Sequence, residues 1–137
     1  MRLRIRRGEL ELDVVALVNS GYEADSPQLM VPVGLARRPR RLGLWPPPST
    51  AYERIFDTAG GPLRVWVLRK AAVVKVVASD AESREVEVDL IVSPLADEPL
   101  ISDVLADELE IALESPGRGL WRFRWEPSTK TRLSEVR

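Results

Sequence analysis

The stretch that decides the fold class is Arg2-Leu-Arg-Ile-Arg-Arg-Gly-Glu-Leu-Glu-Leu-Asp13. Aliphatic and charged residues alternate on both sides of Gly8, which is the two-residue period of half-buried β-strands. A two-residue turn at Arg7-Gly8 would place each arginine opposite an acid and each aliphatic residue opposite another. The stretch therefore predicts an antiparallel hairpin with one charged and one aliphatic face. The expected charged pairs are Arg6 with Glu9, Arg4 with Glu11 and Arg2 with Asp13.

Short apolar strands joined by turn residues continue along the rest of the chain. Short helices are expected over 33–38, after Pro32, and from the N-cap Ser102 to about Leu109. No long helices alternate with the strands. The sequence therefore predicts an all-β chain, mainly an antiparallel closed barrel, with one or two short helices. The further hairpins expected are 52–57 with 63–68, 71–79 with 84–92, and 111–114 with 120–125.

The length of 137 residues fits one domain with a modest core, which we place at residues 1–125. Residues 126–137 are polar and aperiodic, so a loose C-terminal tail is expected. No apolar run approaches the ~20 residues that span a bilayer. The charged start, residues 1–7, is not followed by the apolar segment of a signal peptide. A cytoplasmic protein is the default expectation.

The absence of two residue types excludes several kinds of catalytic and metal site. There is no Cys and no His, which excludes disulfides, thiol nucleophiles, imidazole bases and zinc sites built on Cys or His. Carboxylates remain as the acid–base groups, and neither a metal nor a cofactor is expected. The 17 Arg against 3 Lys, with a single Asn and a single Gln, are typical of a protein from a thermophile.

Charge is unevenly distributed along the chain. Residues 1–75 carry 13 basic and 7 acidic groups, whereas residues 76–137 carry 7 basic and 14 acidic groups. The basic cluster Arg37-Arg38-Pro39-Arg40-Arg41 would attract phosphates. However, no aromatic residues are interleaved with it, and acids are expected opposite the arginines of the first hairpin. The sequence therefore favours a solvated basic surface, and a nucleic-acid partner is not expected.

Four features follow one another in a fixed order. An apolar strand runs into a turn, Val14-Val-Ala-Leu-Val-Asn-Ser-Gly21, and a short strand and helix then end at Leu35-Ala36, before Leu42-Gly43-Leu44. A glycine-tipped hairpin carries Asp57-Thr-Ala-Gly-Gly61, and the segment Glu98–Leu105 leads into the second helix. This order resembles the retropepsin-like family of single-domain aspartic proteases, including its small prokaryotic members. The resemblance covers roughly residues 9–124.

The resemblance implies a homodimeric protein with a retropepsin-like barrel in each subunit. In that family the apolar strand ends in the catalytic Asp-Thr/Ser-Gly, and the glycine-tipped hairpin is the flap over the substrate. Two such turns meet on the two-fold axis, where the paired aspartates share one proton and activate a water. The catalytic position thus falls on Asn19, Ser20 and Gly21, and the flap tip on Ala59, Gly60 and Gly61.

This sequence departs from the family pattern in three places. Asn19 replaces the aspartate, Ser102 replaces a glycine, and Arg38-Pro39-Arg40 looks like an insertion. A carboxamide is neither an acid nor a base at neutral pH, whereas acid–base help is worth ~10²–10⁴-fold in rate. We therefore expect a catalytically inactive pseudo-protease, a homodimer that binds an extended peptide between its flaps.

Two alternatives stay open. One is an active aspartic endopeptidase with a non-standard site, for which deamidation of Asn19 to Asp is one route. The other is a nucleic-acid-binding or scaffold protein that uses the Arg-rich first half of the chain.

Several other residues have a structural interpretation. Asp57-Thr58 begins like the catalytic triplet, but Ala59 breaks it, so a hairpin shoulder is favoured. Asp103 is expected to complement a helix dipole, and Asp25 is expected to be a solvated loop carboxylate. The tryptophans expected on strands, in the core or in an interface, are Trp66, Trp121 and Trp125.

Overall fold

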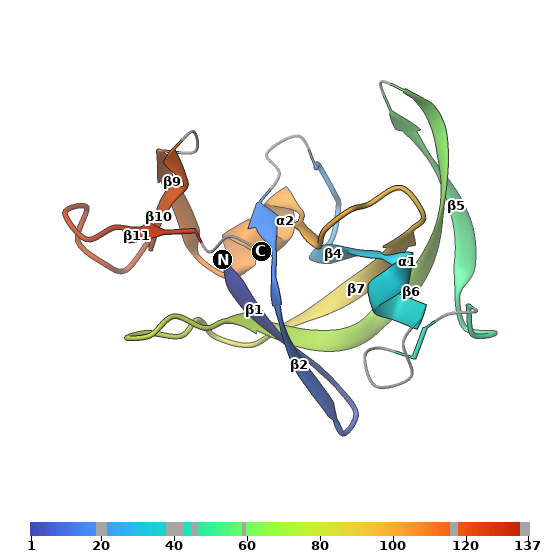
Figure 1. Cartoon of the computed structure of the whole chain (residues 1–137), viewed down its shortest axis with the longest axis horizontal. Helices are drawn as coiled ribbons and strands as arrows, with labels where there is room; N and C mark the ends of the chain where they lie inside the picture. The colour runs from blue at the N-terminus through green and yellow to red at the C-terminus, as the bar shows by residue number, and fades with distance from the viewer. Residues whose placement is uncertain (19–21, 38–42, 45–46, 59, 116–117, 135–137) are drawn as a thin grey trace.

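The computed structural model describes residues 1–18, 22–37, 43–44, 47–58, 60–115 and 118–134. Strands dominate it and the two helices are short, so the expected mainly β class is confirmed (Figure 1). The elements are β1 Arg2–Arg7, β2 Leu10–Val15, β3 Leu17–Val18, β4 Gln28–Pro32, α1 Val33–Arg37, β5 Tyr52–Thr58, β6 Gly61–Val76, β7 Val86–Ser93, β8 Leu100–Ile101, α2 Asp103–Glu108, β9 Ile111–Ser115, β10 Leu120–Phe123 and β11 Arg132–Leu133.

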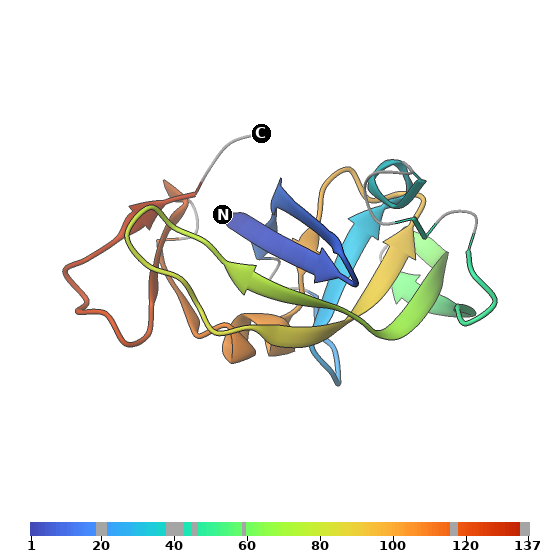
Figure 2. The ribbon, with the colours of Figure 1, turned by 90° about the horizontal axis from the view of Figure 1, so that it is seen from below.

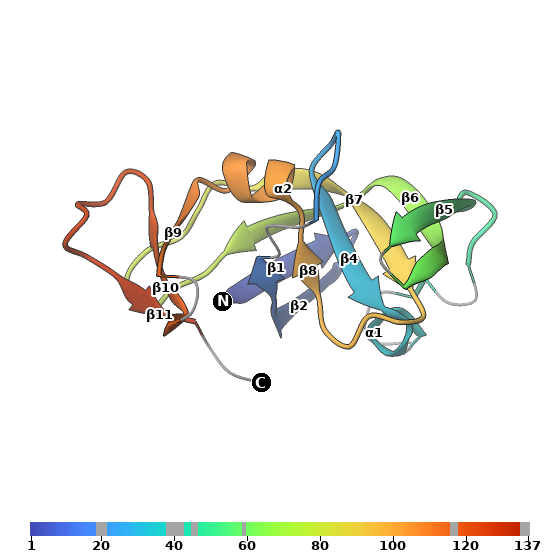
Figure 3. The same cartoon turned by 90° about the horizontal axis from the view of Figure 1, so that it is seen from above.

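The strands form two sheets. The larger has the order β2-β1-β6-β7-β4-β8-β3, with β5 paired to β6 beside this path, and the smaller has the order β11-β10-β9. Most ladders are antiparallel, but β3 pairs with β8 and β4 pairs with β7 in parallel. Within the described ranges no ladder joins the outer strands β2 and β3, so a closed barrel is not found. Figure 3 shows the smaller sheet and the β5–β6 hairpin at opposite ends of the long axis.

The first hairpin forms as expected, but its register differs by two residues. Arg4 pairs with Asp13 and Arg6 with Glu11, so the turn lies at Gly8-Glu9 and not at Arg7-Gly8. Gly8 adopts a φ of 59° at the first central position of this turn, where glycine is favoured. Because the shift is an even number of residues, every side chain stays on its predicted face.

The second and third hairpins share one long strand, β6. The expected pairing of β5 with the first half of β6 is confirmed from Tyr52–Val67 to Thr58–Gly61. β7 pairs with β6 from Trp66 to Val74, and the register shifts between Leu68 and Ala72, where Lys70 has a φ of 47°. Such a bulge bends a strand and increases its twist. In Figure 1 β6 curves strongly along its length.

The main core lies between the large sheet, α1, α2 and the strands that follow α2. Its largest fully buried side chains include Leu3, Ile5, Leu44 and Phe123, all at 0% exposure. Leu3 and Ile5 belong to the aliphatic face that the alternation of the first hairpin predicted. Leu44 donates a backbone hydrogen bond to Ala36 after α1. The apolar residues on both sides of the 38–42 segment thus contribute to the core.

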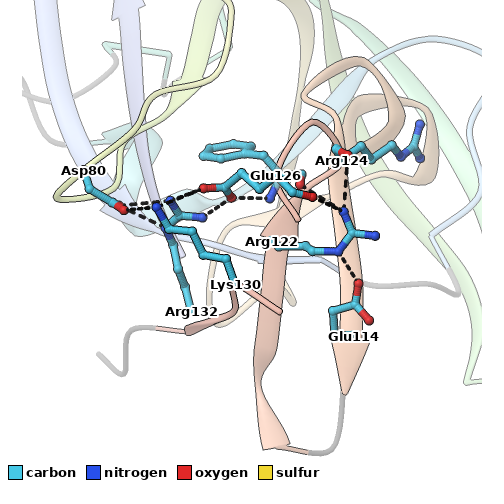
Figure 4. Close-up of polar contacts among 8 residues, drawn as sticks. Asp80, Glu114, Arg122, Arg124, Glu126, Lys130 and Arg132 are labelled. Atoms are coloured by element: carbon cyan, nitrogen blue, oxygen red, sulfur yellow. Dashed lines mark hydrogen bonds and ion pairs between the residues drawn. The ribbon is translucent and has the colours of Figure 1, made fainter. Parts of the chain in front are cut away.

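Residues 126–134, expected as part of a loose tail, are instead folded onto the rest of the protein. β11 pairs with β10, and Glu126 is buried. Arg132 forms ion pairs with Glu126 and with Asp80, at the turn between β6 and β7 (Figure 4). Figure 2 shows this turn beside the smaller sheet. The expectation was wrong because Arg132 finds a partner in Asp80, 52 positions earlier, and Glu126 is held by Arg132 and by the Phe123 N–H.

Candidate functional site

The residues expected at the catalytic position, Asn19, Ser20 and Gly21, lie outside the described residues, as does Ala59 at the expected flap tip. Gly60 is exposed in the turn between β5 and β6, and Gly61 begins β6 with a φ of 108°, which favours glycine. The glycine-tipped hairpin is therefore confirmed. Its role as a flap stays a prediction.

An open groove of about 710 Å³ lies between β5 and the segment that follows Gly21. One wall is the segment from Tyr22 to Met30, with Leu100 of β8 beside it. The other wall is β5. We call this space the groove; it is lined by Tyr22, Glu23, Ala24, Asp25, Gln28, Met30, Arg54, Ile55, Phe56, Asp57 and Leu100.

The floor of the groove is apolar. A second hydrophobic cluster, separate from the main core, contains Tyr22, Met30, Val65, Val67 and Ile91, and Phe56, Leu63 and Leu100 pack against it. Val65 and Val67 are paired with Arg54 and Tyr52 of β5. Since opposite residues of an antiparallel pair share a face, Tyr52, Arg54 and Phe56 lie on the groove side of β5.

A chain of side-chain hydrogen bonds fixes the first wall. The Tyr22 hydroxyl donates to Gln28 Oε1 at 2.9 Å, and Gln28 Nε2 donates to the Ser26 hydroxyl at 3.2 Å. The Ser26 hydroxyl in turn donates to Asp89 on β7 at 2.8 Å. Burial, and the negative charge of Asp89 and Asp103 nearby, raise the pKa of Tyr22. Tyr22 is therefore a neutral phenol whose hydroxyl is already engaged.

Hydrogen bonds from the start of helix α2 also fix the wall formed by the 22–30 segment. Asp103 accepts a hydrogen bond from the Ala24 N–H at 2.9 Å, and its own N–H donates to the Tyr22 carbonyl at 2.9 Å. Ser102 caps α2, as expected, by accepting from Leu105 N–H. Asp103 lies in the first turn of α2, as predicted. Its hydrogen bonds to the 22–24 loop were not predicted from the sequence.

The second wall, β5, ends the sheet. Among the described residues β5 pairs only with β6, so its other backbone edge is unpaired. Such an edge is a template on which an extended peptide adds as a further strand. Asp57 belongs to β5, which agrees with the expected hairpin shoulder. Asp25 lines the groove and is exposed, which agrees with the expected solvated loop carboxylate.

Arg4 and Arg6 of the first hairpin are compensated, although the ion-pair partner of Arg6 lies outside the hairpin. Arg4 forms an ion pair with Asp13 at 2.9 Å, and Arg6 with Glu85 at 2.8 Å. Of the basic cluster, Arg37 is exposed at the end of α1, and residues 38–41 lie outside the described residues. The described part of the chain contains no group of three acidic side chains that could hold a metal ion. None of its helices is long and apolar enough to cross a membrane.

The tryptophans take three different positions. Trp66 is half-buried on β6 and Trp121 is buried on β10. Trp125 was expected on a strand, but it lies in the turn after β10, 51% exposed, and stacks on Phe123 at 4.2 Å between ring centroids. Neither Trp121 nor Trp125 lines the groove.

Comparison with models of known protein families gives no match to this chain, and comparison with curated proteins gives none either. The retropepsin-like resemblance therefore stays a prediction. Sequence reasoning missed most of the groove, including Tyr22, Gln28 and Arg54. The single Gln and the half-polar face of 52–56 were the available signals, but nothing in the sequence placed them side by side.

Proposed function

We propose that two copies of this chain form a retropepsin-like homodimer that binds an extended peptide in the groove without cleaving it. The observation that carries this proposal is the groove itself. It combines an apolar floor, a polar wall fixed by hydrogen bonds and an unpaired strand edge on β5. These are the features that hold a peptide through its backbone and through alternate side chains.

The topology supports the retropepsin-like part of the proposal. β3, which directly precedes Asn19, pairs in parallel with β8, which is separated from α2 by Ser102 alone. The groove begins at Tyr22, the first residue after Gly21, so the turn of the family motif adjoins it in sequence. β2 and β3 are separated by Ala16 alone, so the two outer strands of the large sheet are joined through the chain itself.

An exposed apolar side chain supports the homodimer. Leu17 on β3 is 38% exposed, two residues before Asn19. In the proposed dimer this region faces its copy across the two-fold axis, which would cover Leu17. The absence of cleavage follows from Asn19, because two carboxamides do not exchange the proton that two carboxylates share.

The mass in solution and peptide binding test the proposal together. Sedimentation equilibrium should give twice the mass of one chain at micromolar concentration. A fluorescent peptide library should contain binders by anisotropy, and Phe56→Ala should weaken them. Leu133→Ala is the matched control, since Leu133 is 73% exposed on β11 and does not line the groove. A monomer that binds none of the peptides would end the proposal.

Cleavage assays separate this function from the active-peptidase alternative. The native chain should leave the same peptides intact at acid and neutral pH, and cleavage should appear only with Asn19→Asp. Cleavage by the native chain that is lost with Asn19→Ala would instead support a deamidated or unconventional site.

A further inference from the structure

Two arginines line a second pocket beside the groove. Arg54 of β5 and Arg69 of β6 both line a smaller pocket of about 240 Å³. This pocket shares Asp25, Gln28 and Arg54 with the groove, so the two spaces are neighbours. We call it the arginine pocket. Its remaining lining includes Tyr52, whose ring is on the groove side of β5.

Aromatic rings, rather than carboxylates, hold both arginines in place. The Arg54 guanidinium lies 5.6 Å from the centroid of the Phe56 ring, and that of Arg69 lies 5.8 Å from the Tyr52 ring. Arg69 Nε also donates to the Tyr52 hydroxyl at 3.2 Å. Within the described part of the chain neither arginine forms an ion pair. A ring stabilises a cation without neutralising it, so both keep charge and donors for a ligand.

The acids of the arginine pocket do not cancel this charge directly. Asp89 is engaged through both oxygens, by the Lys70 N–H at 2.8 Å and by the Ser26 hydroxyl at 2.8 Å. Asp25 is exposed, and among the described residues no ion pair joins it to Arg54 or Arg69. A carboxylate entering the pocket thus meets two guanidinium groups and is opposed by the charges of Asp25 and Asp89.

We propose that the groove selects peptides with an acidic side chain two positions from an apolar one, an inference that rests on the proposed peptide binding. A strand added along β5 presents every second side chain to the groove face. Arg54 and Phe56 are two residues apart on that face. When an apolar side chain packs against Phe56 and Met30, the side chain two positions away therefore faces Arg54 and Arg69, where a carboxylate accepts charge-assisted hydrogen bonds.

Three peptides that differ at one position test this inference. They carry Glu, Gln or Lys two residues from a Leu, in both sequence orders, with acetylated and amidated ends so that the side chain is the only source of a carboxylate. Anisotropy should show the Glu peptide binding about tenfold more tightly than the Gln peptide, with Lys weakest. The difference should shrink as salt is added.

The outcomes distinguish the acidic preference from the proposed peptide binding on which it rests. Equal affinity for the Glu and Gln peptides would overturn the acidic preference and leave peptide binding in place. Binding of none of the three, alongside a negative library screen, would overturn the proposed function itself.

Substitutions on the two faces of the β5–β6 hairpin test whether Arg54 and Arg69 cause the acidic preference. Arg54→Gln and Arg69→Gln should each reduce the Glu-over-Gln ratio about three- to tenfold, while Asp25→Asn should increase it. Arg64→Gln is the matched control, because Arg64 pairs with Glu53, 3.7 Å away, on the opposite face of β5 and β6. A loss with Arg64→Gln equal to that with Arg54→Gln would show a general charge effect and overturn the inference.

Discussion

Ser102 and Gln28, 74 positions apart in the sequence, are joined by two hydrogen bonds. The Gln28 N–H donates to the Ser102 hydroxyl at 3.1 Å, and the Ser102 N–H donates to the Gln28 carbonyl at 3.1 Å. The same hydroxyl accepts from the Leu105 N–H as the cap of α2. One fully buried oxygen therefore positions both the start of α2 and the start of the groove wall.

Ser102→Ala should lower the free energy of unfolding by about 1–3 kcal/mol, because it removes a helix cap and leaves two buried N–H groups without their acceptor. Urea denaturation at neutral pH measures the change. Ser79→Ala in the exposed turn after β6 is the control and should cost less than about 0.5 kcal/mol. A loss no larger than that of the control would show that the shared oxygen contributes little.

Glu110→Gly should stabilise the protein by about 0.5–1 kcal/mol. Glu110 follows the α2 C-cap Leu109 with a φ of 59°, a conformation that glycine adopts without the Cβ penalty. Thermal and urea unfolding measure the gain. Glu110→Ala separates backbone strain from loss of charge, since alanine keeps the Cβ. A gain of the same size with alanine would contradict the explanation from φ.

Stability should fall as the pH drops from about 4.5 to about 2, and Glu126 should carry part of this loss. Its hydrogen bonds and ion pair with Arg132, together with the Phe123 N–H, lower the pKa of its carboxyl from 4.5 to about 2 in the folded protein (Figure 4). A depressed pKa stabilises the folded state above the unfolded value and ceases to do so once the folded carboxyl is protonated.

Glu126→Gln should therefore lower stability at pH 7 and flatten its dependence on pH between about 4.5 and 2. Urea midpoints at pH 7, 4 and 2.5 measure both effects. Glu9→Gln, exposed in the first hairpin turn, should leave the native pH dependence unchanged. If Glu126→Gln loses as much stability between pH 4.5 and 2 as the native protein, other carboxyl groups cause the loss. Asp80 is the first of these to test, because Lys130 and Arg132 lower its pKa to about 2.

Tyr22→Phe should cost about 1–2 kcal/mol, because Gln28 Oε1 would lose its donor in a buried position. The change should also weaken peptide binding, since Gln28 and Tyr22 both line the groove. Tyr52→Phe is the comparison: Tyr52 is 38% exposed, so its effect on stability should be smaller. Equal costs for the two variants would show that the buried chain of hydrogen bonds adds nothing.

The sequence predicted the parts of the fold that local pattern controls. Alternation located the aliphatic face of the first hairpin, and Ser102 located the start of α2. The exact register depended on which residues enter the turn, and two placements of Gly8 satisfy the same alternation. The observed pairing, with Arg7 opposite Leu10, distinguishes them.

The parts that were missed depend on contacts between distant segments. The polar composition of residues 126–137 predicts a loose tail, yet Arg132 is satisfied by Asp80, 52 positions earlier. The groove requires β5 to lie opposite the 22–30 segment, which follows from both packing against the same five-residue cluster. A polar or charged side chain gives no local signal of which distant partner it will meet.

β6 runs without a break from the hairpin beside the groove to the turn that holds Asp80. The β5–β6 hairpin is therefore continuous with the large sheet, and it cannot move away from the groove as an independent unit. Any widening has to bend the strand where it is already irregular, at Lys70, or separate it from β7. The bulge between Leu68 and Ala72 is thus the natural hinge, and the backbone there sets how wide the groove opens.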